Sequence, residues 1–138
     1  MDAFDADVII YAAVADHPLG HRVVGLFHRA RERFAGVGSV LLIPEVLSKP
    51  LRDGGTTEVR MLAGLLGRLD LRPVDRSTAE LATALAIKYG LKAADAIHLA
   101  TAVAVGADRF LTNNRRDFPP TITEVSVIYP ADMPDETR

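Results

Sequence analysis

The chain has 138 residues, of which 49% are hydrophobic and 25% are charged, and its formal net charge is −2. This length predicts one domain with a substantial core over residues 1–138, and the composition excludes an intrinsically disordered protein. The sequence contains no cysteine, which excludes a disulfide framework, a cysteine-based zinc site and a thiol nucleophile. Any catalysis must therefore use oxygen or nitrogen groups.

The N-terminus does not resemble a targeting signal. It carries three acids, Asp2, Asp5 and Asp7, where a secretory signal peptide needs positive charge. The apolar run that follows is much shorter than the roughly 20 residues that span a bilayer. We therefore expect a soluble protein of the cytoplasm that has no membrane partner.

Short apolar runs alternate with longer amphipathic segments in the first half of the chain. Residues 4–11 contain several β-branched side chains and are expected to form a buried strand. Helical spacing of apolar residues predicts a helix over residues 20–35. Residues 40–43 form a second apolar run, and Pro44 is well placed as the first residue of a helix over 44–51.

The second half continues the alternation of helices and strands. The predicted elements are a helix over 58–69, a strand over 71–74, a helix from Ser77 (with Glu80 in a capping box) to Gly90, a helix over 93–105, and strands over 110–112 and 125–129. Strands separated by helices favour a parallel sheet with both faces covered. The expected fold class is α/β, a three-layer α/β/α sandwich with a mostly parallel sheet of about five strands.

Five carboxylates stand where such a fold places functional groups. Asp5 lies within the first predicted strand, with Asp7 on the same strand face, and a buried ionised carboxylate costs several kcal/mol unless it is compensated. Glu45 and Asp117 follow the ends of predicted strands, and Asp95 lies in the first turn of a helix. Each has an ordinary structural explanation, such as an exposed strand start, a helix-dipole contact or a turn.

Taken together, the acids indicate a metal site. In a parallel sheet, the carboxyl ends of the strands and the helix starts that follow them converge on one crevice. Several carboxylates in one crevice without matching lysines call for a divalent cation, and all-oxygen ligands suit Mg²⁺ or Mn²⁺ rather than zinc. Such sites perform phosphoryl chemistry.

Four segments resemble the motifs of PIN-domain nucleases. They are residues 4–11, 44–47, 91–102 and 107–118, which occur in the order found in that family. The third segment, with Ala94-Asp95-Ala96-Ile97, is the most specific. The resemblance implies a PIN-like fold and a metal-dependent endoribonuclease that hydrolyses RNA. Most often such a protein is the toxin of a VapBC-type toxin–antitoxin pair, so an antitoxin partner and a homodimer are also implied.

The resemblance also implies roles for particular residues. The metal-binding and catalytic acids would be Asp5, Glu45, Asp95 and Asp117. Asp7 stands where the family commonly has Asn or Ser, and Asn114 stands where it sometimes has an acid. Both are further candidate metal ligands.

Other side chains near these acids have weaker assignments. Lys92, Arg115 and Arg116 are candidate contacts to RNA phosphates, although ordinary solvated charges explain them equally well. His98 lies one turn from Asp95, and we expect it to pack or to form a hydrogen bond near the site rather than to act directly.

Two alternatives to this function remain open at the level of sequence. The Asp5-Ala6-Asp7-Val8 segment also matches the Asp-x-Asp-x-Val motif of haloacid-dehalogenase-like phosphatases, in which Asp5 would be the nucleophile. That fold requires Ser or Thr at the end of the second strand, where this chain has Ile43-Pro44. The second alternative is a catalytically inactive PIN-like binding module, which would bind no metal.

Overall fold

The computed structural model describes residues 1–14 and 16–134, so residues 15 and 135–138 of the expected domain lie outside the described part. Five strands form one sheet in the order β3-β2-β1-β4-β5, and every neighbouring pair is parallel. The strands are β1 (Asp2–Phe4), β2 (Gly36–Ser39), β3 (Leu69–Arg72), β4 (Arg109–Leu111) and β5 (Ser126–Ile128). The chain builds outward from β1 in both directions, so the strand order reverses between β1 and β4, where parallel sheets open a crevice.

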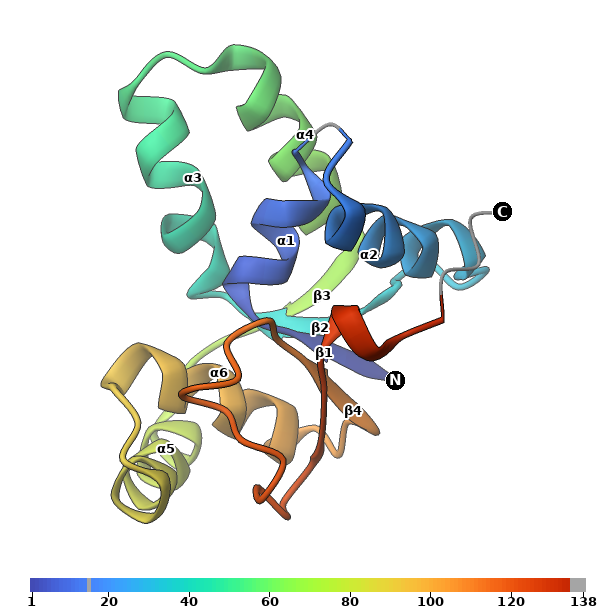
Figure 1. Cartoon of the computed structure of the whole chain (residues 1–138). Coiled ribbons are helices and arrows are strands. Elements are labelled where there is room, and N and C mark those ends of the chain that lie inside the picture. Colours follow the sequence, from blue (N-terminus) through green and yellow to red (C-terminus); the bar gives the residue numbers. More distant parts are fainter. Residues whose placement is uncertain (15, 135–138) are drawn as a thin grey trace.

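Helices cover both faces of this sheet (Figure 1). On one face lie α1 (Ala6–Ala12), α2 (Pro18–Arg29), α3 (Leu42–Arg52) and α4 (Thr56–Leu66), and on the other lie α5 (Arg76–Tyr89) and α6 (Ala93–Ala104). A 3-10 helix, η1 (Pro130–Asp132), follows β5 and contacts α2. The three-layer α/β/α prediction is confirmed.

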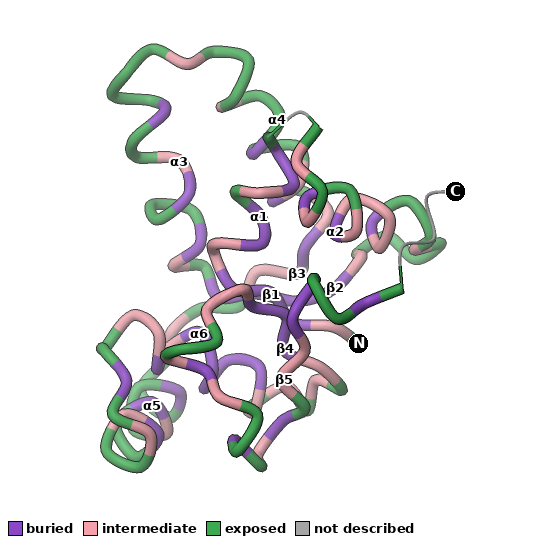
Figure 2. The backbone as a smooth tube through the Cα atoms, viewed as in Figure 1, coloured by how far each residue is buried: buried purple, intermediate pink, exposed green. Residues whose placement is uncertain are grey.

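Each face of the sheet has its own hydrophobic core, and buried backbone runs through the strands between the two helical layers (Figure 2). Successive strand residues point to opposite faces. Phe4 and Leu111 accordingly pack under α1–α4, while their neighbours Ala3 and Phe110 pack under α5 and α6. The sheet therefore separates the two sets of helices.

The prediction of a strand over residues 4–11 is wrong beyond its first residue. β1 ends at Phe4, and Asp5 then caps α1 by accepting a hydrogen bond from the next backbone N–H. The buried residues of α1 are Val8, Ile9 and Ala12. These share one helix face, whereas a strand would bury alternate residues. Asp7 consequently lies in the first turn of a helix and not on a strand face.

The second strand also differs from its prediction. β2 is Gly36–Ser39, and the apolar residues 40–43 instead lead into α3. Because α3 begins at Leu42, Pro44 is its third residue and not its first. The first N–H groups of a helix have no partner inside it, so proline is tolerated there. The shift leaves Glu45 in the first turn of α3, as expected.

The elements of the second half are all present, with displaced ends. The N-cap of α5 is Asp75, whose carboxylate accepts a hydrogen bond from the Thr78 N–H at 2.8 Å. The predicted capping box of Ser77 and Glu80 is therefore wrong. Gly90 ends α5 in the left-handed conformation, with φ of 66°, as predicted. Within the described ranges, no helix combines the length and the apolar character that a membrane span requires.

Candidate active site

Asp5 lies at the carboxyl end of β1, in the middle of the sheet. Its side chain is buried, with only 5% of the residue exposed. Its Oδ1 accepts a hydrogen bond from the Ala6 N–H at 2.9 Å, and its Oδ2 accepts one from the Thr112 hydroxyl at 2.8 Å. Thr112 directly follows β4 and is fully buried. These two contacts fix the carboxylate at the point where the strand order reverses.

Asp7 is attached to the same edge through the backbone that follows β4. Its Oδ2 accepts a hydrogen bond from the Asn113 N–H at 3.0 Å. Asp5 and Asp7 therefore reach the site from the end of β1 and the start of α1, and each is held by a residue of the Thr112–Asn113 segment. Asp7 is close to Asp5 because the chain turns into a helix, and not because of strand alternation.

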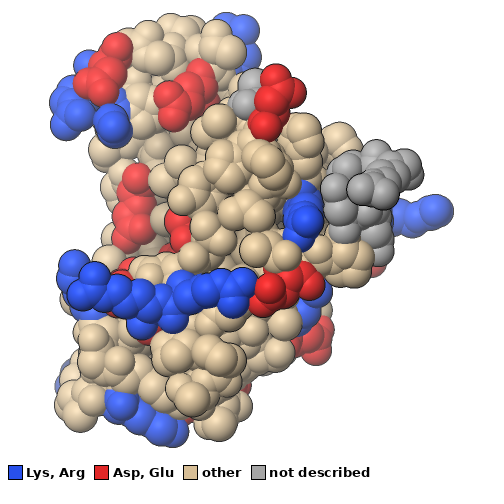
Figure 3. All heavy atoms as spheres, viewed as in Figure 1, with Lys and Arg blue, Asp and Glu red and all other residues tan. Residues whose placement is uncertain are grey.

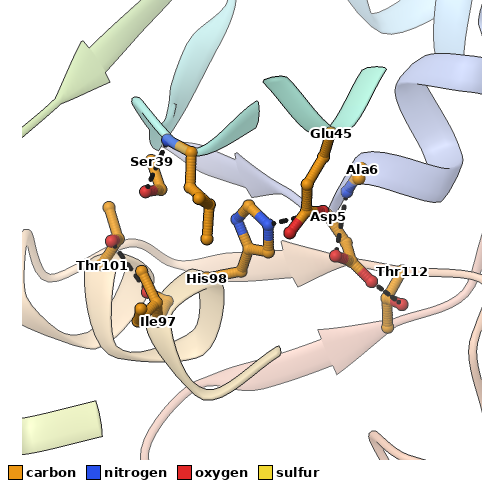
Figure 4. Close-up of polar contacts among 9 residues, drawn as sticks. Asp5, Ala6, Ser39, Glu45, Ile97, His98, Thr101 and Thr112 are labelled. Atoms are coloured by element: carbon orange, nitrogen blue, oxygen red, sulfur yellow. Dashed lines mark hydrogen bonds and ion pairs between the residues drawn. The ribbon is translucent and has the colours of Figure 1, made fainter. Parts of the chain in front are cut away.

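Glu45 reaches the site from α3 and pairs with a histidine of α6. The Nε2 atom of His98 lies 3.1 Å from Oε2 of Glu45. The His98 side chain is 1% exposed, whereas that of Glu45 is 31% exposed. In Figure 4 the imidazole of His98 points toward the Glu45 carboxylate, and Asp5 lies on the far side of Glu45. This contact joins helices that cover opposite faces of the sheet.

The remaining candidates come from the start of α6 and the segment after β4. Asp95 lies in the first turn of α6, as predicted. The Asn114 Nδ2–H donates to Oδ2 of Asp117 at 2.8 Å, and the Asp117 N–H donates back to Oδ1 of Asn114 at 3.1 Å. Asn114 and Asp117 therefore form one unit, in which the amide orients the carboxylate.

Mutual repulsion adds to burial at three of these acids. Burial raises the pKa of Asp5, against opposing effects of His98 and of its hydrogen bonds. Burial, and next the charge of Asp5, raises the pKa of Asp7 to about 7. Burial, followed by the charges of Asp5 and Asp117, raises the pKa of Asp95. Each of these acids is thus close enough to another carboxylate for their charges to interact.

The chemistry of this group fits a hard divalent cation. All the acidic candidates offer carboxylate oxygens, which Mg²⁺ and Mn²⁺ prefer. No Lys or Arg is among the main influences on the pKa values of Asp5, Asp7 and Asp95. The one basic group among these influences is His98, which acts on Asp5 and Asp95. A cation would therefore supply the missing positive charge. In the described residues, however, no group of three or more His, Asp or Glu side chains is placed so that it could hold a metal ion as it stands.

The surface around the acids is hollowed and edged by basic side chains. Figure 3 shows acidic groups in the hollow between the α3–α4 hairpin and the layer that holds α5 and α6, with a band of Lys and Arg along its lower rim. Lys92, Arg115 and Arg116 are exposed. Arg115 is already engaged, since its guanidinium lies 4.1 Å from the centre of the Tyr129 ring and 3.0 Å from the Asp132 carboxylate.

Sequence reasoning missed two groups that hold the acids. Thr112 and the backbone N–H of Asn113 bind Asp5 and Asp7, and neither was singled out as a site residue. A polar residue directly after a buried apolar strand is the one signal that points to Thr112. A backbone N–H leaves no sequence signal at all.

The raised pKa of Asp7 predicts how the stability of the metal-free protein depends on pH. The folded state keeps the proton up to about pH 7, whereas the unfolded state releases it near 3.8. Between these values the folded state binds more protons, so the free energy of unfolding falls as pH rises. The loss is at most roughly 4 kcal/mol, from about 1.4 kcal/mol per pKa unit. Denaturant melts in EDTA at pH 5 and pH 8 should show the part of this fall that lies between pH 5 and about 7, roughly 3 kcal/mol, and a smaller fall in Asp7→Asn. Equal falls in both proteins would contradict the assignment to Asp7.

A parallel α/β domain with carboxylates gathered at the carboxyl edge of its sheet is the class that this fold and site define. Within this class, the family model of the PIN domain matches residues 3–120, and the chain belongs to this family. The resemblance drawn from the four sequence motifs is confirmed. Because the matched residues include Asp5 and its surroundings, the haloacid-dehalogenase-like alternative is not retained.

Solved structures with the same fold include complexes of toxins and antitoxins. A toxin–antitoxin complex from Klebsiella pneumoniae has 22% identity and a TM-score of 0.75, and the match covers 96% of this chain and 100% of that one. The structure of VapBC2 from Rickettsia felis bound to a promoter DNA fragment has 14% identity and a TM-score of 0.72, over 93% of this chain and 97% of that one.

The structure of FitAB bound to the IR36 DNA fragment is also similar. It has 21% identity and a TM-score of 0.70, and the match covers 99% of each chain. At these identities the likeness establishes the fold. No curated protein sequence matches the chain.

Proposed function

We propose that this chain is a metal-dependent endoribonuclease and the toxin component of a VapBC-type toxin–antitoxin pair. The observation that carries the proposal is the convergence of carboxylates from four segments on one edge of a PIN-domain sheet, where burial and neighbouring charges raise the pKa values of Asp5, Asp7 and Asp95. A nuclease needs such a group to hold a cation against a phosphodiester. The similarity to the toxin–antitoxin complex from Klebsiella pneumoniae and to VapBC2 from Rickettsia felis supports the second part of the proposal.

In the proposed reaction each acid has a role that follows from its position. The residues that would hold Mg²⁺ or Mn²⁺ are Asp5, Glu45, Asp95 and Asp117, with Asp7 and Asn114 as further candidates. When bound, the cation lowers the pKa of water and neutralises charge on the phosphate. Asp5 is held rigidly by Thr112 and provides a fixed oxygen. Arg116 and Lys92, on exposed parts of the chain, would bind the flanking RNA phosphates.

The direct test is to incubate the protein with a labelled RNA and Mg²⁺ or Mn²⁺, to analyse the cleavage products, and then to add EDTA to the reaction. We expect internal cleavage that leaves a 3′-hydroxyl and stops with EDTA, with water as the nucleophile. An inactive PIN-like binding module would neither cleave RNA nor bind Mn²⁺ at millimolar concentration. That pair of negative results would replace the proposal with the alternative.

The hydrogen bonds between Asn114 and Asp117 predict which of two substitutions in this segment lowers activity more. Replacing Asp117 with Asn removes a proposed ligand, whereas Asn114→Ala removes only the amide that orients it. Loss of such an orienting partner typically costs roughly 10- to 100-fold in activity or metal affinity, so Asn114→Ala should lie near the lower end and Asp117→Asn should cost more. Single-turnover rates at saturating metal measure both. The reverse order would make Asn114 the fourth ligand.

An antitoxin has a suitable surface next to the acids. A groove of about 350 Å³ runs between α1, α3 and α4, and its lining includes Ile10, Glu45, Lys49 and Glu58. Ile10 is exposed and lines this groove together with Glu45. A partner segment that filled this groove would cover Glu45 and so hinder the approach of RNA to the site. We expect a small neighbouring reading frame whose product relieves the toxicity of this chain when the two are expressed together.

We further propose a homodimer in the cytoplasm, with the chain forming one nuclease domain. RNA substrates and a DNA-binding antitoxin both require access to the cytoplasm. Light scattering at micromolar concentration should give twice the chain mass. A monomer would remove the homodimer and would leave the proposed chemistry unchanged.

A further inference from the structure

The contact between His98 and Glu45 has a feature that packing does not explain. His98 is surrounded on α6 by the buried residues Ala96, Leu99 and Ala100, and its own side chain is 1% exposed. Its Nδ1 atom has no hydrogen-bond partner in the described part of the chain. An unpaired buried nitrogen is unfavourable, and an apolar side chain of similar volume would avoid that cost. The one polar contact of the ring that we find is its Nε2 bond to Glu45.

The geometry of this contact determines the tautomer. A carboxylate only accepts hydrogen bonds, so Nε2 must carry the hydrogen that faces Glu45. In the neutral ring, Nδ1 then holds a lone pair. His98 thus donates one directed hydrogen bond from a fixed position inside the α6 layer.

Glu45 needs such a contact more than Asp5 and Asp7 do. Asp5 and Asp7 are short side chains that backbone N–H groups already hold. Glu45 has an additional rotatable bond, and 31% of its side chain is exposed. Among the described residues, His98 is the one hydrogen-bond partner found for the Glu45 carboxylate. Without it, the carboxylate would be free to turn toward solvent.

The contact also spans the two layers at the site. Asp95 and His98 lie three residues apart and therefore on one face of α6, whereas Glu45 belongs to α3 on the other side of the sheet (Figure 4). The position of Glu45 relative to Asp95 thus depends on His98. We propose that His98 is a positioning residue that holds the Glu45 carboxylate over Asp5 and Asp95, so that acids from both layers bind one cation. This inference rests on the proposed function of the site.

Three substitutions separate positioning from packing. In His98→Gln the amide nitrogen can reach the place of Nε2, and in His98→Asn it reaches only the place of Nδ1. His98→Leu fills the volume without a donor. Mn²⁺ affinity by calorimetry should fall by roughly 10- to 100-fold in the Leu and Asn variants, as for lost partners of metal ligands, and should stay near wild type in the Gln variant. A packing role would instead favour Leu over Gln.

A second readout is the melting temperature of each variant with Mn²⁺ minus that in EDTA, which cancels differences in basal stability. In a Glu45→Ala background, His98→Leu should cause no further loss of Mn²⁺ affinity, because the residue acts through Glu45. Additive losses, or full Mn²⁺ affinity in His98→Leu alone, would overturn the positioning role while leaving the proposed nuclease intact. Absence of any Mn²⁺ effect on wild type would overturn both.

Discussion

Replacing Asp95 with Asn is expected to lower the rate of metal-dependent RNA cleavage by more than about 100-fold, since even the loss of a partner that only orients a metal ligand costs roughly 10- to 100-fold. Asp95 lies in the first turn of α6, where the charges of Asp5, Asp117 and Glu45 all act on it. The substitution keeps the shape of the side chain and removes its charge. Single-turnover rates at saturating Mn²⁺ are the appropriate measurement.

The fold should survive this substitution. The N-cap of α6 is Lys92, and the α6 core is formed by other residues, so Asp95 has no structural role that an amide cannot fill. Far-UV circular dichroism should match that of wild type. Glu80→Gln is the matched control, because it removes one charge from the exposed face of α5, where Glu80 forms an ion pair with Arg76. Full activity of Asp95→Asn, or an equal loss in the control, would show that the active site is assigned wrongly.

Metal should stabilise the wild-type protein far more than a variant that lacks one of the acids. A cation that binds only the folded state at 100 times its dissociation constant adds about 2.7 kcal/mol. For a domain of this size that corresponds to roughly 10 °C in Tm. Asp5→Asn and Asp95→Asn should gain much less. Parallel thermal melts with EDTA and with excess Mn²⁺ measure the difference.

The same variants should be more stable than wild type in EDTA. In the metal-free site, burial and the charges of neighbouring carboxylates raise the pKa values of Asp5 and Asp95, so each of these acids costs free energy that a neutral amide at the same position does not. An amide at position 5 still accepts the Ala6 N–H, and the Thr112 hydroxyl can turn to accept from its NH₂ group. Equal metal-induced shifts in variant and wild type, or lower stability of the variants in EDTA, would mean that these acids do not form one repelling cluster.

The sequence by itself determined the alternation of helices and strands, the parallel sheet and the identity of the acids. These depend on local signals: helical stripes such as that of α4, Gly90 at the end of α5, and the acid in the first turn of α6. The motifs around Asp5 and Asp95 pointed to the PIN family, to which the chain belongs. Each signal lies within one segment, where propensity and spacing act directly.

Tertiary structure decided where the first two strands lie. The β-branched residues after Asp5 form a helix because their shared face packs into the core beneath α2, α3 and α4, which overrides their strand propensity. β2 is glycine-rich because the strands approach closely: a Cβ on Gly36 would lie 2.3 Å from the carbonyl oxygen of Asp2. Neither cause is visible within a single segment.

Tertiary structure also decided how the acids are held. Thr112 binds Asp5 across 107 residues of sequence, and His98 binds Glu45 across 53. These pairs form only because parallel strands bring the ends of β1, β2 and β4 to one edge, with the start of α6 beside them. The types of the acids could be read from the chain because carboxylates carry the chemistry. The hydrogen-bond partners of the acids could not be read from the chain. A hydroxyl, an imidazole or a backbone N–H orients a carboxylate only when the fold places it next to that carboxylate.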